Sequence, residues 1–303
     1  MLTINIPVYN IDARPLVFEL AKQVKNATIE TEIRVYDDGS DEATKTKNRE
    51  LNKIPFVTYL EMDKNIGRSA IRNKMAKESK GICLLFIDAD SAVVTGNYLQ
   101  NYVDHLDKGR VLCGGTKYSA HKPKDRHKLL RWLYGTKREA ISASERNRKK
   151  GFIITSNNFI TEKELFLKTL FNEKIGPYGH EDTLLGYELF KNGVLPFHID
   201  NPVEHTGLEN SATFLNKTQS ALKNLLLKKK NIVRSQADFI AQVRFLNRYS
   251  KITSFIPAFL LRIFYYLFHR LLTKNLTGGN PQLFWFDVYK LCYFAKIKNR
   301  EPE

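Results

Sequence analysis

The stretch that decides the fold is Leu84-Leu85-Phe86-Ile87-Asp88-Ala89-Asp90, in which four apolar residues run directly into two carboxylates separated by one alanine. An apolar run this short, after Gly81 and before Ser91, is typical of a buried strand of a parallel sheet. Ligands of open α/β sheets bind beyond the carboxyl ends of such strands. Paired carboxylates there suit Mg²⁺ or Mn²⁺ together with substrate phosphates. Capping of the next helix by a strand-end Asp is the alternative.

The composition is that of a globular protein with an ample core. The chain has 303 residues, of which 43% are hydrophobic and 12% aromatic, enough for one large α/β domain with an appendage or for two domains. Its cysteines, Cys83, Cys113 and Cys292, lie far apart without metal-ligand spacing, which indicates buried thiols in a reducing compartment. No charged-then-apolar signal opens the chain, and residues 1–6 already predict a strand.

The positive charge is concentrated toward the carboxyl end. The net charge is +16, and residues 206–303 carry 16 Lys and Arg against 5 Asp and Glu, which leaves only +5 for the first 205 residues. A basic segment of this kind binds nucleic acid or an anionic membrane, or is simply a solvated face.

The first hundred residues alternate between expected strands and expected helices, a pattern that predicts a parallel, doubly wound, nucleotide-binding half. No G-x-G-x-x-G follows the first strand and no Walker A lysine motif is present, which argues against a dinucleotide or P-loop site. The expected strands are 1–8, 32–36, 56–60 and 84–87, and the expected helices are 16–24, 41–51 and 65–80.

The next hundred residues continue the alternation with two less regular parts. Residues 121–150 are strongly basic, which we interpret as a solvated face or an acceptor-side loop. The apolar run at 152–155 predicts a strand that ends in Ser156-Asn157-Asn158. The remaining expected elements are helices at 97–106 and 162–170 and strands at 111–115 and 194–199.

Several polar groups follow expected strands or begin expected helices. Arg68 and Arg72 share a helix face near its start and form either a phosphate site or a surface charge pair. A Gly/Pro-rich loop from Gly176 delivers Glu181-Asp182 to a helix start, where Asp182 serves as a cap or as a general base. His205 follows a late strand, as a structural histidine or a metal ligand.

Taken together, these motifs resemble family 2 glycosyltransferases of the GT-A fold over about residues 1–210. Their order and spacing are more specific than any one of them. The matching motifs are Pro7-Val8-Tyr9-Asn10, Asp37-Asp38-Gly39-Ser40, Asn65-Ile66-Gly67-Arg68-Ser69-Ala70-Ile71-Arg72-Asn73, Asp88-Ala89-Asp90, Ser156-Asn157-Asn158, Glu181-Asp182 and His205.

The resemblance implies a donor site for a UDP-sugar and a divalent cation, Mn²⁺ or Mg²⁺. Asp38 would accept a hydrogen bond from the uracil or thymine N3–H, and Asp90 would bind the cation with His205, with Asp88 near the ribose and the metal. The further positions that match the nucleotide-sugar site are Pro7, Val8, Tyr9, Asn10, Asn65, Arg68, Arg72 and Ala89.

The resemblance also implies the acceptor side and the reaction. Asn157, Asn158 and Glu181 match the sugar and acceptor pocket, and Asp182 matches the catalytic base of inverting members. The implied function is sugar transfer from a nucleotide diphosphate-sugar to a hydroxyl of a glycan or lipid-linked acceptor in surface-polysaccharide synthesis. A retaining transferase, a nucleotidyltransferase and a non-catalytic nucleotide-sugar-binding or membrane-associated scaffold are the alternatives. A nucleotidyltransferase would need a Gly- and Lys-rich loop after the first strand, which this chain lacks.

We expect a catalytic domain at 1–210, with its nucleotide-sugar half at about 1–110 and its acceptor half at about 111–210, and a basic, aromatic, helical extension at 211–303. Amphipathic helices are expected over 214–248, around Lys228-Lys229-Lys230. The apolar run 255–272 is long, but Pro257, Arg262, His269 and Arg270 argue against a clean membrane span.

The helices expected over 251–300 suit the plane of an anionic membrane. A helical pair that packs on the catalytic domain or forms a homodimer explains them equally well. Nucleic acid is not expected, because the bulky Leu, Ile and Phe clusters exceed what base stacking needs. The expected location is cytoplasmic and peripheral, on the inner face of the cell membrane.

Overall fold

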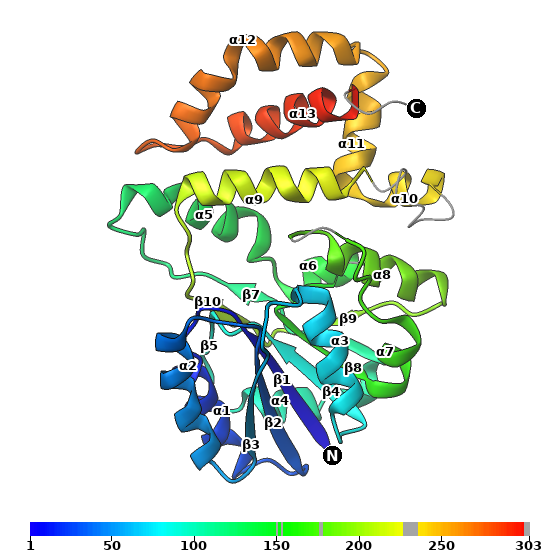
Figure 1. Cartoon of the computed structure of the whole chain (residues 1–303). Helices are drawn as coiled ribbons and strands as arrows, with labels where there is room; N and C mark the ends of the chain where they lie inside the picture. The colour runs from blue at the N-terminus through cyan, green and yellow to red at the C-terminus, as the bar shows by residue number, and fades with distance from the viewer. Residues whose placement is uncertain (150, 153, 176–177, 227–235, 300–303) are drawn as a thin grey trace. The chain divides into compact units, whose positions relative to one another are not determined.

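The contacts of the chain divide it into two units, which are described separately (Figure 1). The computed structural model describes residues 1–149, 151–152, 154–175, 178–226 and 236–299. The first unit comprises Met1–Ser119, Glu139–Lys174 and Glu181–Gly207. The second unit comprises Ala120–Arg138, Ile175–His180 and Leu208–Glu303. Lys228, Lys229 and Lys230 lie outside the described residues, as do Gly176 and Pro177 of the loop before Glu181.

The first unit is built on a seven-stranded sheet with the order β3-β2-β1-β4-β8-β6-β9. The first four strands pair in parallel, β8 runs antiparallel to both of its neighbours, and β6 and β9 are parallel. The expected α/β fold with a mostly parallel central sheet is thus confirmed. The strands are β1 (Leu2–Val8), β2 (Thr31–Asp37), β3 (Val57–Glu61), β4 (Cys83–Ile87), β6 (Val111–Cys113), β8 (Asn158–Glu162) and β9 (Phe197–His198).

Helices cover both faces of this sheet, as the near-continuous apolar strand β4 requires. Leu85 and Ile87 of β4 belong to the core under α1 and α4, whereas Leu84 and Phe86 belong to the core under α3, α7 and α8. This alternation is the two-residue period of a strand that is buried on both sides. The helices are α1 (Arg14–Val24), α2 (Glu42–Asn48), α3 (Arg68–Glu78), α4 (Tyr98–Val103), α6 (Ala143–Arg148), α7 (Lys163–Thr169) and α8 (Glu181–Lys191).

A second, three-stranded sheet in the first unit was not expected from the sequence. Its order is β5-β10-β7, with β5 at Ser91–Val93, β10 at Val203–His205 and β7 at Thr116–Lys117. β5 begins directly after Asp90 and runs antiparallel to β10, so that His205 pairs with Ser91. His205 therefore lies within a strand, and the sheet carries it beside the acidic end of β4.

The strand expected at 152–155 is wrong. The strand begins later, at Asn158, so that Ser156 and Asn157 precede it instead of ending it. The Phe152 ring packs against Tyr187 and Phe190 of α8. A Cβ at Gly186 would lie 2.0 Å from the Phe152 carbonyl oxygen, so helix and chain are in close contact there. A short apolar run does not distinguish a strand from another buried segment.

The basic segment 121–150 is not uniformly a solvated face. Arg146 of α6 donates hydrogen bonds to the carbonyl oxygens of Cys113 (3.1 Å), Gly114 (3.2 Å) and Ile199 (3.0 Å). Burial lowers the pKa of this guanidinium. Arg146 thus ties the end of β6 to the chain after β9, where the carbonyl oxygens of Cys113 and Gly114 also accept backbone hydrogen bonds from Ile199 and Asn201.

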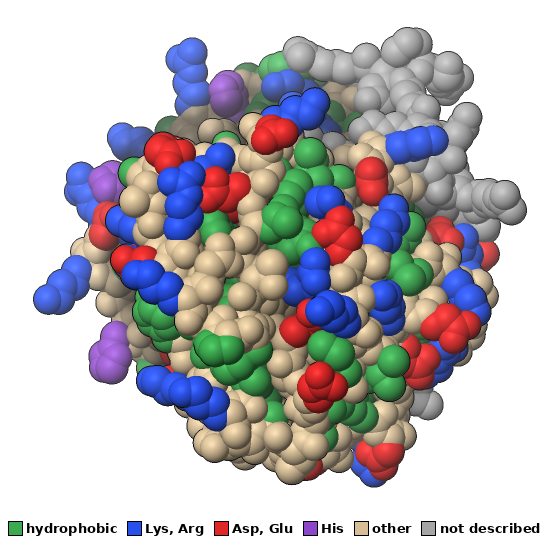
Figure 2. Space-filling model, turned by 60° about the horizontal axis from the view of Figure 1, so that its bottom comes forward, with side chains coloured by type: hydrophobic (Ala, Val, Ile, Leu, Met, Phe, Trp, Pro, Cys, Tyr) green, Lys and Arg blue, Asp and Glu red, His purple; other side chains and the backbone are tan. Residues whose placement is uncertain are grey.

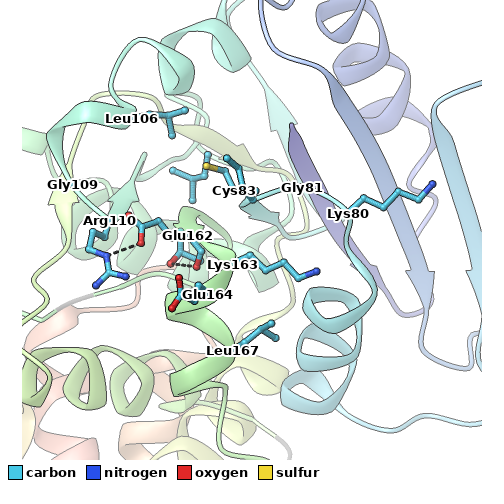
Figure 3. Close-up of a pocket in the computed structure, with 13 residues that line it drawn as sticks. Lys80, Gly81, Cys83, Leu106, Gly109, Arg110, Glu162, Lys163, Glu164 and Leu167 are labelled. Atoms are coloured by element: carbon cyan, nitrogen blue, oxygen red, sulfur yellow. Dashed lines mark hydrogen bonds and ion pairs between the residues drawn. The ribbon is translucent and has the colours of Figure 1, made fainter.

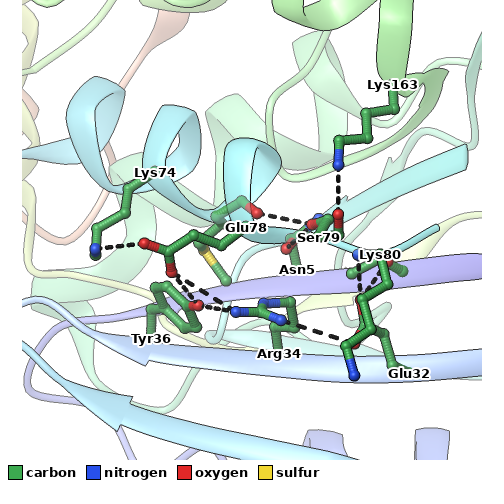
Figure 4. A network of polar contacts seen from close by, with 11 residues as sticks. Asn5, Glu32, Arg34, Tyr36, Lys74, Glu78, Ser79, Lys80 and Lys163 are labelled. Atoms are coloured by element: carbon green, nitrogen blue, oxygen red, sulfur yellow. Dashed lines mark hydrogen bonds and ion pairs between the residues drawn. The ribbon is translucent and has the colours of Figure 1, made fainter. Parts of the chain in front are cut away.

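A polar network fastens the carboxyl end of α3 to β2 (Figure 4). In β2, Nη1 of Arg34 lies 3.7 Å from Oε2 of Glu32, and Nη2 lies 3.6 Å from Oε2 of Glu78 in α3. The Tyr36 hydroxyl donates to Glu78 at 2.5 Å, and Lys74 contacts Glu78 at 2.6 Å. Strand β2 and the carboxyl end of α3 are held together by these charges in addition to apolar packing.

The second unit is helical, and its most buried helix is α13. The helix α13 packs against α12, α9 and α5, and Phe286, Tyr289 and Tyr293 are 5% exposed or less. The helices of this unit are α5 (Leu129–Tyr134), α9 (Ser211–Asn224), α10 (Gln236–Gln242), α11 (Arg244–Thr253), α12 (Ala258–Leu276) and α13 (Leu283–Asn299). No single described helix meets the length and hydropathy expected of a membrane span, whereas α11 and α12 taken together do, with a bend of 104° between them.

Charges of both signs are interspersed on the face of the molecule that Figure 2 shows. Many surface cations of the first unit pair with acids, for example Arg14 with Asp12 at 2.7 Å and Arg49 with Glu61 at 2.8 Å. This pairing agrees with the small net charge of the first 205 residues.

Candidate functional site

The predicted site forms where β4 ends, and Asp88 lies at its centre. Arg72 of α3 donates a short hydrogen bond from Nη2 to Asp88 Oδ1, and Arg68 donates from Nη2 to Asp88 Oδ2 at 3.2 Å. Burial alone would raise the pKa of Asp88, but the two guanidinium groups outweigh it and hold the pKa below its ordinary value. Arg72 is itself buried, and this burial lowers its pKa. The shared helix face expected for Arg68 and Arg72 therefore points at a carboxylate.

Arg68 connects the end of β4 to the start of α8. Its Nε donates to Oε1 of Glu181 at 3.1 Å, while its Nη2 contacts Asp88. Burial would raise the pKa of Glu181, and the charge of Arg68 outweighs that effect, so that the pKa is lowered. Glu181 is 6% exposed. Arg68 and Glu181 lie 113 positions apart in the chain, and the guanidinium of Arg68 brings Glu181 and Asp88 together.

Asp182 differs from its acidic neighbours because its pKa is raised, to about 7. The causes are burial and the adjacent negative charge of Glu181, which outweigh a hydrogen bond that Oδ1 accepts from the Thr183 N–H at 2.6 Å. A carboxyl with a pKa near neutrality is matched to removing a proton at neutral pH. The pKa of Asp182 is therefore raised, whereas the pKa values of Asp88 and Glu181 are lowered.

Asp90 and His205 meet at the junction of the two sheets. Oδ2 of Asp90 lies 3.5 Å from Nδ1 of His205. The Nε2 atom of His205 is buried and has no hydrogen-bond partner among the residues that the structure describes. Its ring packs edge-on against Tyr118 at 5.5 Å, which restricts its orientation.

The Asp90–His205 pair fits one divalent cation. Bonds of about 2.1 Å to a common cation place two adjacent ligand atoms about 3 Å apart, near the observed 3.5 Å. Within the described ranges, no group of three or more His, Cys, Asp or Glu side chains is arranged to hold a metal ion. Two protein ligands suit Mg²⁺ or Mn²⁺, which take their remaining ligands from substrate phosphates and water.

Gly207 makes room for the carboxylate of Asp90. A Cβ at position 207 would lie 2.7 Å from Asp90 Oδ2, closer than van der Waals contact allows. Thr206 donates to the Asp90 carbonyl oxygen from both its N–H (2.9 Å) and its hydroxyl (2.8 Å). The segment after His205 therefore wraps around Asp90, and only glycine fits there without displacing the acid. Sequence reasoning missed Thr206 and Gly207, because proximity to His205 was the only signal for them.

The loops expected to hold the nucleotide base lie together, with Asp38 at their junction. Both carboxylate oxygens of Asp38 accept backbone hydrogen bonds, from Ile66 at 2.7 Å and Gly67 at 3.0 Å. Burial raises its pKa despite these bonds. The N–H of Asn10 donates to Ser40 Oγ at 2.7 Å. Asp38 thus fixes the turn that starts α3, and a contact to a base N3–H would have to use its remaining lone pairs.

The same loops approach one another so closely that a glycine is required. Gly39 has φ +78°, and a Cβ there would lie 2.6 Å from the Asn65 backbone nitrogen. Tyr9 is 52% exposed, so its ring is available to a ligand. Pro7 and Val8 are the last residues of β1 and lead into this cluster.

The two asparagines expected in the acceptor pocket have different environments. The side chain of Asn157 donates from Nδ2 to Thr116 Oγ1 at 2.8 Å, and its backbone carbonyl oxygen accepts from the Asp88 N–H. Asn158 is fully buried and uses both ends of its amide. It donates to Gly115 O and Asn201 O and accepts from the hydroxyls of Tyr98 and Tyr102.

Asn158 therefore differs from its expected role, because no part of its amide remains for a sugar. Thr116 and Asp37 are polar residues near the site that the sequence did not single out for a role. Asp37 is buried and accepts from the Tyr59 hydroxyl at 2.9 Å and from the Ser40 N–H at 2.7 Å, which supports the turn that carries Asp38.

A cavity of about 690 Å³ lies at the opposite edge of the sheet (Figure 3). Its wall includes Cys83 at the start of β4 and Glu162 at the end of the antiparallel strand β8, where Glu162 pairs with Arg110 at 2.7 Å. Ligands of such sheets bind beyond the carboxyl ends of the strands. The cavity is therefore separate from the candidate site.

The fold of this chain is similar to that of solved glycosyltransferases. The chain is similar to S. aureus TarS 1–349, with 16% identity, a TM-score of 0.55 and coverage of 99% of this chain and 91% of that chain. It is also similar to the mannosyltransferase PcManGT from Pyrobaculum calidifontis in complex with GDP-Man and Mn²⁺, with 16% identity, a TM-score of 0.58 and coverage of 99% and 86%. TarS 1–349 has also been solved in complex with UDP-GlcNAc. No curated protein sequence matches the chain.

The fold is that of the GT-A glycosyltransferases, as the resemblance implied. The sequence model described as glycosyl transferase family 2 matches residues 3–168, more than half of the chain. The chain belongs to this family and is a glycosyltransferase.

Proposed function

We propose that this chain is an inverting, metal-dependent glycosyltransferase that moves a sugar from a UDP-sugar to a hydroxyl of a glycan or lipid-linked acceptor. The observation that carries the proposal is that the acids that follow β4 and those that start α8 have different environments. Asp88 is held ionised by two arginines, Asp90 lies beside His205, and Asp182 has a pKa raised to about 7.

In this proposal, donor binding uses the end of β4 and the loops around Asp38. Asp90 and His205 would hold Mn²⁺ or Mg²⁺ together with the donor diphosphate. The cation supplies positive charge that stabilises the departing diphosphate. Asp38 and the Pro7-Val8-Tyr9-Asn10 loop would contact the nucleotide base, and Asp88 the ribose.

The transfer step would depend on Asp182. Its carboxylate accepts the proton of the acceptor hydroxyl while the hydroxyl oxygen attacks the anomeric carbon of the sugar. The bond between that carbon and the diphosphate oxygen breaks, and its electron pair leaves with the nucleoside diphosphate. Attack from the face opposite the leaving group inverts the anomeric configuration. General-base assistance of this kind contributes about 10²–10⁴-fold to the rate.

The proposal is tested first at the donor, because donor binding needs no knowledge of the acceptor. A panel of nucleotide sugars is screened by thermal unfolding with and without Mn²⁺, since a ligand that binds only the folded state raises the unfolding temperature by mass action. UDP-sugars are expected to stabilise the protein only with the cation present. The Asp90→Ala protein should lose the Mn²⁺-dependent stabilisation by UDP-sugars. The Asp107→Ala protein, which carries the same change at an exposed acid away from the site, should keep it. Equal stabilisation of the Asp90→Ala protein would contradict the metal role.

A retaining transferase is the second candidate, and one contact favours it. Oδ1 of Asp182 accepts from the Thr183 N–H at the start of α8, which is a helix-start contact and needs no acceptor. A non-catalytic, nucleotide-sugar-binding scaffold is consistent with the same contact. NMR of the product anomer distinguishes inversion from retention, and nucleotide-sugar hydrolysis with Mn²⁺ distinguishes both from a scaffold.

We also propose that the enzyme works in surface-polysaccharide synthesis at the inner face of the cell membrane. The support is the net charge of +11 in residues 206–303 together with the apolar, aromatic helices of that region. A peripheral position would bring the enzyme to a lipid-linked acceptor.

A further inference from the structure

Helix α12 has apolar side chains on all sides, although only one side is covered. Tyr265, Leu272 and Leu276 are buried, and α12 packs against α13. Figure 1 shows the two helices side by side. A helix that is apolar all round belongs in a protein core or in a membrane, so its uncovered side needs a partner.

The uncovered side is a continuous stripe, which we call the outer face of α12. Leu260, Ile263, Leu267 and Leu271 follow one another at spacings of three, four and four residues, so they share one helix face. Each of them is between 45% and 67% exposed. Phe255, at the bend before α12, is 88% exposed. Exposed apolar surface of this continuity marks an interaction site.

The charges around the outer face have one sign. Arg244–Thr253 and Ala258–Leu276 contain six Lys and Arg residues and no Asp or Glu. Arg270 and Lys274 continue the apolar stripe at its carboxyl end. Within the described part of the chain, neither makes an ion pair. The exposed charges of Arg270 and Lys274 are therefore not neutralised by an ion pair among the described residues, whereas Arg248 of α11 pairs with Asp287 at 3.5 Å.

An anionic lipid surface fits this combination better than a second copy of the chain. A symmetric dimer through the outer face would set α11 and α12 of one copy against the same helices of the other. Because these helices contain Lys and Arg but no Asp or Glu, the basic residues would find no acids on them across the interface. An anionic bilayer offers negative charge at its surface and apolar chains below it, the two features that this helix presents.

We propose that the outer face of α12 inserts into an anionic membrane with the helix axis in the plane of the bilayer. Leu260, Ile263, Leu267 and Leu271 enter the acyl boundary, and Arg270 and Lys274 contact lipid phosphates. The opposite side of α12 remains on α13, which keeps its aromatic residues in the core of the second unit. This inference assigns the proposed membrane attachment to one helix face instead of to residues 251–300 as a whole, and it does not depend on the sugar-transfer chemistry.

The test is flotation of the full-length protein with vesicles of phosphatidylcholine alone or with phosphatidylglycerol. The protein is expected to float with the anionic vesicles, less so at high salt, and not with phosphatidylcholine alone. Leu267→Glu should weaken the apparent partitioning roughly tenfold, because a charge replaces a side chain that enters the bilayer. Arg270→Gln/Lys274→Gln should weaken it less and should remove most of the salt dependence.

Two control variants match these changes at exposed positions of the first unit. Ile82 is 72% exposed, comparable to Leu267 at 67%, so Ile82→Glu makes the same chemical change elsewhere. Lys22→Gln/Lys168→Gln removes two exposed positive charges. Both controls are expected to float like the unaltered protein. Stabilisation by nucleotide sugar, measured on every variant, separates a failure of membrane attachment from a failure of the donor site.

Four results would overturn the proposal. The first is equal flotation of Leu267→Glu and the unaltered protein, and the second is equal flotation with neutral and anionic vesicles. The third is a dimer in analytical ultracentrifugation that Leu267→Glu dissociates, since the outer face would then be an interface between copies. Retention in cell membranes after an alkaline carbonate wash would contradict the in-plane pose, because it would indicate that α11 and α12 span the bilayer as a bent pair.

Discussion

The two ends of helix α3 carry the same chemistry with different consequences. At its amino end, Arg68 and Arg72 pair with Asp88 and Glu181. At its carboxyl end, Glu78 pairs with Arg34 and Lys74 and accepts from the Tyr36 hydroxyl. Both networks are partly buried and contain an arginine Nε without a hydrogen-bond partner among the described residues, in Arg72 and in Arg34. Burial and ion pairing therefore do not distinguish a functional site from a structural one here.

What distinguishes the two ends is a group that titrates near neutral pH. At the carboxyl end, burial and Glu78 raise the pKa of Tyr36 to about 12, and Lys74 and Tyr36 help to lower the pKa of Glu78 although burial opposes them. At the amino end, burial and Glu181 raise the pKa of Asp182 to about 7. A proton can leave or return only at this end, and also only this end lies at the carboxyl edge of the sheet.

The first prediction concerns the pH dependence of turnover, where the largest effect of these four predictions is expected. Asp182 must be ionised to accept a proton, so kcat/KM should fall about tenfold for each pH unit below about 7. The measurement is nucleotide-sugar consumption at saturating Mn²⁺ over a pH series. A rate that stays level through this range would mean that the titrating acid is not the base.

The second prediction tests the carboxyl end of α3. Arg34→Met leaves the carboxylates of Glu32 and Glu78 without their guanidinium, which should lower the free energy of unfolding by about 0.5–1.5 kcal/mol. The turnover of the folded protein should not change, because this network lies at the carboxyl end of α3 and the candidate donor site lies at its amino end. Urea unfolding and turnover are measured on the same preparation. A loss of turnover without a loss of stability would erase the distinction between the two ends.

The third prediction concerns Glu181→Gln. Removing the neighbouring negative charge should lower the pKa of Asp182, and the released Arg68 acts in the same direction. The acid limb of the pH–rate profile should then move to lower pH by about one unit or less. Glu188→Gln, on the same helix and paired with Lys191 at the surface, should leave the limb in place. A shift to higher pH would show that Glu181 does not raise the pKa of Asp182.

The fourth prediction, with the smallest effect, concerns stability. A carboxyl whose pKa is raised on folding binds more protons in the folded state, so its ionisation costs stability above about pH 7 and this cost is relieved as the pH falls. Asp182→Asn removes the charge and should raise the unfolding temperature at alkaline pH by about 2–4 °C, with a smaller gain at acidic pH. Thermal unfolding at two pH values measures the difference. Destabilisation at alkaline pH would indicate that the Asp182 carboxylate is held by favourable contacts.

The sequence predicts the fold well where its signals are local. The apolar run before Asp88 and the regular spacing of strands and helices suffice for the parallel half of the sheet. The expected strand at 152–155, of which Ile153 lies outside the described residues, shows the limit of this approach, since Phe152 packs against α8 and the strand begins only at Asn158. The small sheet of β5, β10 and β7 depends on pairing between distant segments, which residue patterns do not contain.

The site was predictable as a set of residues but not as a set of contacts. Motif order indicates that Asp38, Asp88 and Asp182 matter, and only the fold shows that Arg68 joins Asp88 to Glu181. Asn158 has a side chain of the kind that binds sugars, but its amide group already makes hydrogen bonds within the protein core. The contacts of Gly207 and Thr206 with Asp90 could not be predicted from the sequence, because they depend on the fold that brings these residues together.

The most direct test of the account is turnover and donor binding in the Asp182→Asn protein. Nucleotide-sugar consumption with Mn²⁺ is measured beside calorimetric binding of UDP, with Glu188→Gln as the control on the same helix. If Asp182 is the general base, turnover falls by about 10²–10⁴-fold while UDP binding remains close to that of the unaltered protein. Turnover near the unaltered rate would contradict the assignment of Asp182 as the base, and with it the functional difference between the two ends of α3.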